Sequence, residues 1–431
     1  MEALQSKRLN DFGKKGWAII LFTLLIYLFS SVPNDTLNVT AEFFALHLGM
    51  QTSNALLVFS AVGGFAGVAV SLIFGWIISK YRVKRPSAIL FLIYGVLWLV
   101  NGQVNSFLMY GLVVTLLTAF SNPLNLITTQ QIMNNWFPKK KGVALGWATA
   151  GMPISGAVMV AVFQKMILGI DLSAPFYLMF AICIAMALLF ALWFKNYPEE
   201  AGAYPDNEPI SEEEQRKNLV LISSYRSPFT VGRLFRTGQF WLIIVIFGFL
   251  FMGLVGLLSQ MVPRLMVVGL DQNGAILWLT IASLVGIPMS YVWGVIDQKI
   301  GTKRAVMVFA LLWTVMMALS AVGSGLNSLS VSIISVVFLS CLHGGMANLM
   351  PSLIIQIFGR YDFAQANKLI TPIVVGIRCA SLIVIPLILE IAGVGNEAVG
   401  YRNVFLVFTV LSLISFLASV ILKSRTIGRT D

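Results

Sequence analysis

A single basic residue, Arg378, stands in the middle of a long apolar stretch in the second half of the chain. Thr371, Arg378 and Ser381 share one face of this stretch at helical spacing. A guanidinium keeps its charge in apolar surroundings and offers a planar fork of donors that matches a carboxylate. The pattern predicts that Arg378 binds a substrate anion, with Thr371 beside it. A structural ion pair, or contacts with backbone carbonyls, is the alternative.

The first apolar segment carries a second candidate site. Its polar side chains recur at spacings of four, three and four residues, namely Tyr27, Ser31, Asn34 and Asn38. Such spacing places them on one helix face, which we expect to line a cavity and to contact the substrate. Asp35 lies at the edge of this stripe. Three roles are open for it: to neutralise Arg378, to carry a coupling proton, or to lie at the outer water interface.

Three further features add polar groups to apolar segments. The fourth segment has a similar stripe, namely Thr118, Asn122, Asn125 and Thr129. Cavity lining and hydrogen bonds between helices both fit this stripe, and Asn125 is a candidate substrate ligand. His343 titrates in the physiological range and is a candidate coupling residue, with a buried, hydrogen-bonded histidine as the alternative. Arg264 is expected either to attract anions to the mouth of a transport path or to anchor its helix among lipid headgroups.

The composition defines the solvent of the chain. Of its 431 residues, 58% are hydrophobic and 11% are charged, and the mean hydropathy is +0.86. One soluble core could not bury so much apolar surface, so the lipid bilayer is the expected environment. The three cysteines, Cys183, Cys341 and Cys379, lie in apolar stretches without metal or redox spacing. We therefore predict neither a disulfide framework nor a metal or other cofactor.

Apolar segments of about 20 residues or more predict transmembrane helices. They lie near 16–45, 53–78, 87–105, 107–134, 142–168, 173–194, 239–267, 273–297, 304–323, 329–357, 364–390 and 401–422. Some of these runs could instead be re-entrant. The prediction is an all-α membrane protein of twelve transmembrane helices in two six-helix halves. The halves are residues 1–194 and 239–431, and the polar residues 195–238 are the linker.

Basic residues are distributed unequally between the loops. When loops are assigned alternately to the two sides, 25 of the 29 Lys and Arg residues fall on the side that carries both termini. By the positive-inside rule that side is cytoplasmic, which predicts a multi-pass protein of the plasma membrane. The net charge of +11 is thereby explained without a nucleic-acid partner. Residues 1–15 have no signal-peptide pattern of their own, so the first span is expected to be retained.

A short basic loop occurs twice, at an offset of 219 residues. The matching pairs are Gly75 with Gly294, Lys80 with Lys299, Lys84 with Lys303, and Arg85 with Arg304. A repeat of about half the chain, carried in apolar sequence, is typical of transporters built from two similar halves.

The second copy resembles the loop motif of the major facilitator superfamily, in which a Gly, an acidic residue, a Gly and a basic pair follow helix 2 and, more weakly, helix 8. It retains Asp297, Gly301 and the pair Lys303 and Arg304, with one extra residue between Asp297 and Gly301. The first copy has Ser79 near the acidic position and Arg82 at the second Gly position. The resemblance implies a cytoplasmic gate at Lys80, Lys84, Arg85, Asp297, Lys303 and Arg304. A role in membrane orientation alone is the alternative.

Two other stretches resemble the branch of monocarboxylate transporters and oxalate/formate antiporters. They are Asn135-Trp-Phe-Pro-Lys-Lys-Lys-Gly142, after the fourth span, and Tyr197-Pro-Glu-Glu200, after the sixth. Oxalate/formate exchangers carry basic residues in helices 8 and 11 that face a dicarboxylate. Arg378 matches the element in helix 11, whereas the eighth span has no basic residue between Ala275 and Val295. The resemblance also implies a monomer.

The sequence contains no Walker loop, zincin pair, kinase set or nucleophile elbow, so it predicts neither an enzyme nor ATP-driven transport. It predicts a secondary active transporter that moves a small organic carboxylate by alternating access. The expected partners are that anion, the lipid bilayer and possible coupling protons. One alternative is a proton-coupled exporter of larger amphipathic compounds. Another is a membrane sensor that transports nothing.

Overall fold

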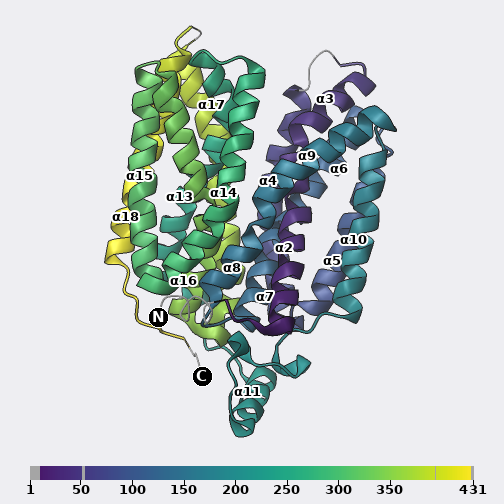
Figure 1. The fold of residues 1–431 in the computed structure, drawn as a ribbon, viewed down its shortest axis with the longest axis vertical. Coiled ribbons are helices and arrows are strands. Elements are labelled where there is room, and N and C mark those ends of the chain that lie inside the picture. The colour runs from purple at the N-terminus through teal and green to yellow at the C-terminus, as the bar shows by residue number, and fades with distance from the viewer. Residues whose placement is uncertain (1–9, 51–53, 394, 429–431) are drawn as a thin grey trace.

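Two groups of helices lie side by side in the computed structural model, which describes residues 10–50, 54–393 and 395–428. The groups approach each other where α7, α8 and α16 meet, and they separate towards α3 and α17 (Figure 1). Helix α11 lies beyond the end at which they approach. We call this end the linker end and the opposite end the distal end.

The first half contains the six predicted spans, of which the first, fourth and fifth are each divided. Its elements are α2 (Gly13–Asp35), α3 (Leu37–His47), α4 (Asn54–Tyr81), α5 (Lys84–Asn101), α6 (Phe107–Asn122), η1 (Pro123–Thr128), α7 (Thr129–Trp136), α8 (Lys141–Thr149), α9 (Gly151–Gly169) and α10 (Ala174–Leu192). The predicted start of the second span, residue 53, lies outside the described residues, as do Lys7, Arg8 and Arg429 of the charge count. Segment η1 is a π-helix that begins at Pro123. Proline has no N–H to donate, and the helix widens there.

The linker and the second half contain the remaining elements of the chain. The linker contains η2 (Glu199–Ala201), η3 (Pro205–Asn207), α11 (Glu212–Ser224) and α12 (Val231–Phe235); the second half contains α13 (Gly238–Val267), α14 (Gln272–Ile300), α15 (Thr302–Gly325), α16 (Leu329–Cys379), α17 (Ser381–Ala392) and α18 (Glu397–Ile421). Helix α16 is interrupted at Gly359, whose φ of 76° and ψ of 171° suit glycine. Two spans therefore meet at Gly359 without an intervening loop.

The helices meet the requirements of a bilayer. In the described part of the chain, ten helical stretches are long and apolar enough to cross a membrane. The stretch 329–392 is 64 residues long and contains two crossings, one on each side of Gly359. The 18-residue helix α5, which packs beside α10, corresponds to the predicted third span. The predicted all-α fold with two six-helix halves is confirmed. The predicted boundaries at residues 194 and 239 stay predictions.

Apolar side chains divide between the core of each half and the lipid. One buried cluster draws on residues 12–194 and another on residues 229–422. Large apolar side chains are also exposed along the helices, among them Leu108, Leu112, Leu192 and Val410. Because lipid chains are as apolar as these side chains, their exposure is expected of a membrane protein. Each half therefore has a core of its own.

The two repeated glycines lie where helices of different halves cross. A Cβ on Gly294 of α14 would lie 3.1 Å from the Cα of Val143 in α8. A Cβ on Gly75 of α4 would lie 2.8 Å from the Cβ of Lys368 in α16. Both crossings bring backbones too close for a larger residue. The repeat of 219 residues thus marks two equivalent contacts between the halves.

The substitution Gly294→Ala should lower the thermal unfolding midpoint of the purified protein. The added methyl group meets the backbone of α8, which cannot move aside as a flexible side chain would, and overpacking of this kind costs about 1–3 kcal/mol. Gly169→Ala is the control, because a Cβ there meets nothing within 4 Å. Equal midpoints for the two variants would contradict this account of the crossing.

Candidate functional site

Arg378 lies inside the bundle in the last turn of α16, just before the helix is interrupted at Ala380. Its side chain is partly exposed, and its Nη2 donates a hydrogen bond to Oδ1 of Asn122 in α6. This bond joins the two halves. Among the described residues no Asp or Glu forms an ion pair with Arg378. Its charge therefore has no acidic partner in the described part of the chain.

A hydrogen bond to Thr118 and packing against Gly67 hold Asn122 in place. It is buried, and its Nδ2 donates to the carbonyl oxygen of Thr118 at 3.1 Å. A Cβ on Gly67 of α4 would lie 3.2 Å from the Cγ of Asn122, so this glycine leaves room for the amide. Asn122 is also the residue before the π-helix. The sequence stripe included Asn122, but no spacing along the chain relates it to Arg378.

The predicted stripe of the first span is divided between buried and exposed positions. Ser31 is buried and accepts a hydrogen bond of 3.0 Å from Nδ2 of Asn125, which also donates to Ser30. Tyr27 is fully buried, whereas Asn34 is exposed. The side chain of Asn38 lies outside the described residues. The pair that the sequence suggested as substrate ligands, Ser31 and Asn125, thus joins α2 to the π-helix, and substrate contacts by these residues stay predictions.

Thr371 also forms hydrogen bonds within the protein. It is fully buried, and its hydroxyl donates to Oδ1 of Asn367 at 2.7 Å and lies 3.5 Å from Oε1 of Gln130. Gln130 belongs to α7, so this cluster lies between the halves. A substrate contact by Thr371 stays a prediction.

The two candidate coupling residues are partly exposed. Asp35 lies beside α9, where its Cγ is 3.9 Å from the position of a Cβ on Gly156. Its Oδ2 is buried without a hydrogen-bond partner in the described structure, and no ion pair joins it to Arg378 there. The described structure therefore does not pair Asp35 with Arg378. His343 lies in the first part of α16 beside Gly344, which packs on Ser290.

A buried ion pair joins the second half to the linker. Arg360 follows Gly359 in the second half, and its Nη1 and Nη2 lie 3.1 and 3.3 Å from the two carboxylate oxygens of Glu199. Nη2 also donates to the carbonyl oxygen of Asn135 at 2.6 Å. In return, Nδ2 of Asn134 donates to the carbonyl oxygen of Arg360 at 3.0 Å. From the sequence, Arg360 is predictable only as one of the basic residues on the cytoplasmic side, although Glu199 belongs to the stretch Tyr197-Pro-Glu-Glu200.

The linker residues around Glu199 are fixed to the first half. Nε1 of Trp136 donates to the carbonyl oxygen of Lys195 at 3.2 Å, and Nδ2 of Asn135 donates to that of Asn196 at 3.1 Å. The two stretches that resemble the monocarboxylate and oxalate/formate branch therefore lie side by side. Arg360 of the second half contacts both.

Asp206 of the linker binds the start of α8. Its carboxylate accepts hydrogen bonds from the backbone N–H groups of Lys139 and Lys140, the shortest at 2.7 Å. The positive end of the helix dipole favours a carboxylate at this position. Burial raises the pKa of Asp206 to about 6, and the two backbone hydrogen bonds oppose that rise.

Of the predicted gate residues, Asp297 lies between the halves. It is buried in α14, and its Cβ is 3.0 Å from the position of a Cβ on Gly142 in α8. Lys141 is its charged neighbour from the first half. Two carboxylates therefore lie at the start of α8, Asp206 of the linker and Asp297 of α14.

The basic gate candidates lie differently. Lys80, Arg85 and Arg304 are exposed, and no described hydrogen bond or ion pair joins their charged groups to the other half. Nζ of Lys303 donates to the carbonyl oxygen of Val420, within the second half. The backbone N–H of Lys84 donates to Oδ1 of Asn196. A gate role for these five residues stays a prediction.

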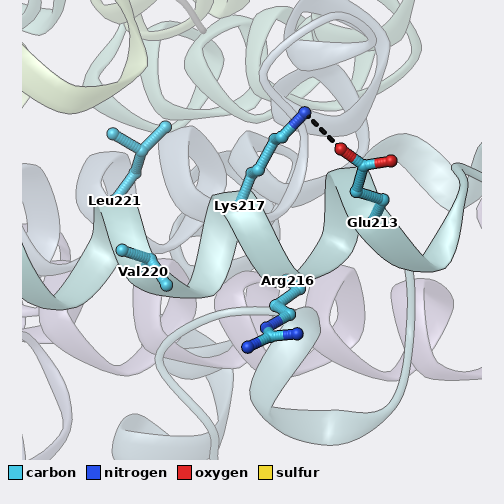
Figure 2. A pocket seen from close by; sticks show the side chains of 5 residues that line it. All are labelled: Glu213, Arg216, Lys217, Val220 and Leu221. Atoms are coloured by element: carbon cyan, nitrogen blue, oxygen red, sulfur yellow. Dashed lines mark ion pairs between the residues drawn. The ribbon is translucent and has the colours of Figure 1, made fainter.

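A depression on α11 is separate from these residues. Figure 2 shows the side chains that line it, namely Glu213, Arg216, Lys217, Val220 and Leu221. Glu213 and Lys217 form an ion pair of 2.7 Å one helical turn apart, and both side chains are exposed. An exposed pair of this kind contributes little to stability. We assign no binding function to this surface.

Comparison with known proteins identifies the family. The sequence profile of the Major Facilitator Superfamily matches residues 21–382. The chain belongs to the Major Facilitator Superfamily. It is therefore an integral, multi-pass membrane transporter and not an enzyme.

The chain is similar in sequence to several curated transporters. It is 24% identical over 177 residues to the probable sulfoacetate transporter SauU of Cupriavidus necator and 23% identical over 242 residues to the oxalate:formate antiporter of Oxalobacter formigenes. It is 26% identical over 196 residues to the hexuronate transporter of Bacillus subtilis. These alignments cover 41%, 54% and 44% of both proteins compared, so the chain spans about half the length of the curated relatives it matches.

Solved structures share the fold. The proton:xylose symporter XylE, bound to 6-bromo-6-deoxy-D-glucose, superposes with a TM-score of 0.72 at 13% identity, over 95% of this chain and 97% of that one. FucP in the outward conformation gives a TM-score of 0.65 at 14% identity, over 93% and 98%. The human organic anion transporter MFSD10 gives 0.64 at 14% identity, over 92% and 98%.

The variant Glu199→Gln should unfold at a lower temperature than the wild-type transporter. It leaves the buried guanidinium of Arg360 without a carboxylate, and loss of one partner of a buried pair costs about 3–5 kcal/mol. Thermal unfolding in detergent measures the change. Glu213→Gln, which breaks the exposed pair of Figure 2, is the matched control. Equal unfolding temperatures for the two variants would contradict a stabilising role of the buried pair.

Proposed function

We propose that the transporter moves a small organic anion and that Arg378 binds its carboxylate. The observation that carries the proposal is a charged, partly exposed guanidinium inside the bundle with no acidic partner among the described residues. A charge within a membrane protein is costly unless it is compensated, and such residues usually mark the path of a substrate or ion. Asn122 accepts a hydrogen bond from Nη2 of Arg378, and a ligand can accept hydrogen bonds from the other N–H groups of the guanidinium.

The names of the relatives support an anionic substrate. Sulfoacetate, oxalate, formate and hexuronate are all organic anions, and the corresponding transporters are related to this chain over about half their lengths. The eighth span of this transporter, α14, has no basic residue between Ala275 and Val295. We therefore propose that Arg378 binds one carboxylate group and that the rest of the substrate meets polar, uncharged side chains. Asn34, which is exposed on α2, is a candidate for such a contact.

Transport would follow alternating access, with the two halves moving as separate bodies. Each half has its own apolar core, and polar contacts between them at the linker end include the Arg360–Glu199 pair and the bond from Asn134 to Arg360. We infer that the described conformation is closed at the linker end. Opening there would separate Arg360 from Glu199 and Asp297 from the start of α8.

The orientation in the membrane follows from charge. Basic residues gather at the linker end, among them Arg82, Lys139, Lys140 and Arg360. By the positive-inside rule we place this end in the cytoplasm of the cell, so that both termini are cytoplasmic and the membrane is the plasma membrane. We further propose that the transporter is a monomer and that Asp35 or His343 takes part in any proton coupling.

Uptake into proteoliposomes tests the proposal. Labelled mono- and dicarboxylates, formate and oxalate among them, are offered to the wild type and to Arg378→Gln. Because a hydrogen bond to a charged group contributes about 1.5–3 kcal/mol, the variant should take up the transported carboxylate about 10- to 100-fold more slowly. Arg402→Gln, which changes an exposed arginine of α18, is the matched control and should transport normally.

The other outcomes distinguish the alternatives. Transport that needs internal substrate indicates exchange, and transport that follows a pH gradient indicates proton symport. If no carboxylate is taken up, or if Arg378→Gln is as active as the wild type, the anion site on α16 is wrong. A proton-coupled exporter of larger amphipathic compounds then becomes the better hypothesis.

A further inference from the structure

Arg264 is a second arginine inside the bundle, and its surroundings differ from those of Arg378. The sequence suggested a place at the mouth of the path or among headgroups, but the structure buries Arg264 completely within the second half. Its Nε donates to Oγ of Ser324 at 3.2 Å, and its Nη2 donates to the carbonyl oxygen of Ser320 at 3.0 Å. Nη2 also lies 3.3 Å from Oγ of Ser335. The guanidinium carbon lies 4.2 Å from the ring centroid of Phe405.

One end of this guanidinium has no partner. Nη1 of Arg264 is buried and makes no hydrogen bond within the described structure. No described Asp or Glu forms an ion pair with Arg264. The ionisable group that faces it is Tyr401, whose hydroxyl donates to Oε1 of Gln260 at 3.1 Å. The charge of Arg264 is thus buried without a described counter-ion.

Two serine hydroxyls beside it are also without partners. Oγ of Ser320 and Oγ of Ser332 are buried and form no hydrogen bond in the described part of the chain. Ser320 is the residue whose carbonyl oxygen accepts from Arg264, and Ser332 lies one turn before Ser335 on α16. Oγ of Ser332 is also 3.0 Å from the position of a Cβ on Gly323, next to Ser324. Three buried donors from α13, α15 and α16, on residues linked by the contacts of Arg264 and Ser335, therefore lack an acceptor among the described residues.

One helix end favours an anion there, whereas the last turns of α13 and α15, which carry Arg264 and Ser324, favour the positive charge of Arg264 itself. Helix α16 begins at Leu329, so Ser332 lies in its first turn, where the helix dipole makes the electrostatic potential positive. A water molecule would need acceptors for its own protons, whereas an anion accepts from every donor around it. A buried charge is also unfavourable without a counter-ion. An acceptor that carries one negative charge satisfies all of these requirements.

We propose that Arg264, Ser320 and Ser332 form a binding site for a small monovalent anion of halide size. Nη1 of Arg264 supplies the charge, and the two hydroxyls donate to the anion from α15 and α16. The complete burial of Arg264 limits the ligand to a small one. The bound anion joins three helices near the distal end of the second half and stabilises that half. It is separate from the substrate site proposed at Arg378.

Thermal unfolding of the purified full-length transporter tests this site. Sodium chloride, bromide, formate or gluconate is varied at constant ionic strength. We expect the midpoint to rise saturably with chloride and bromide and to stay unchanged with gluconate. A response to formate but not to halides would overturn the halide assignment. If the midpoint in chloride equals that in gluconate at every concentration, there is no such site.

Variants locate the response. The double variant Ser320→Ala/Ser332→Ala keeps the three hydrogen bonds that Arg264 donates, so it should fold, and it should need at least about tenfold more chloride for the same stabilisation. Arg264→Gln should lose the response, whereas Arg402→Gln should keep it. An unchanged chloride dependence in the double variant would contradict the proposal. So would loss of the response in Arg378→Gln, because the halide would then be acting at the proposed substrate site.

Discussion

One buried ion pair, between Arg360 and Glu199, holds the second half to the linker at the end where the two groups of helices approach each other. A guanidinium this deeply buried is tolerated because Glu199 and the carbonyl oxygen of Asn135 accept its hydrogen bonds. Gly359 makes the pair possible, since its left-handed backbone turns the chain between two spans without a loop. The linker then holds Glu199 on the first half through Trp136 and its neighbours. Charge compensation thus adds to the close helix crossings at Gly75 and Gly294 where the halves meet.

The same constraint separates the two arginines inside the bundle. Arg378 lies between the halves and is partly exposed. Among the described side-chain oxygens, its guanidinium donates a hydrogen bond only to Asn122, so its other N–H groups are available to a ligand. Arg264 is sealed within the second half among serine groups and Phe405. One position suits a substrate that must bind and leave as the halves move. The other suits an ion that remains bound.

The spans were predictable from the sequence because the thickness of the bilayer sets the length of an apolar helix. The meaning of the repeat was also accessible, since Gly75 and Gly294 occur at matching places beside apolar segments. The hydrogen-bond and ion-pair partners of the polar side chains were not predictable. Ser31 with Asn125, Asn122 with Arg378, and Glu199 with Arg360 are pairs whose contacts depend on how distant helices pack. Arg264 was misplaced because its position near a helix end does not reveal that α15 and α16 enclose it.

Distances between spin labels at both ends of the transporter test the central claim, that the halves rock about a carboxylate bound at Arg378. Suitable exposed positions are Tyr81 and Lys423 at the linker end and Leu108 and Leu326 at the distal end. Double electron–electron resonance is recorded with and without a transported carboxylate. We expect the anion to lengthen the first distance and to shorten the second, and Arg378→Gln to abolish both changes. Distances that ignore the anion, or that change equally in Arg378→Gln, would contradict it.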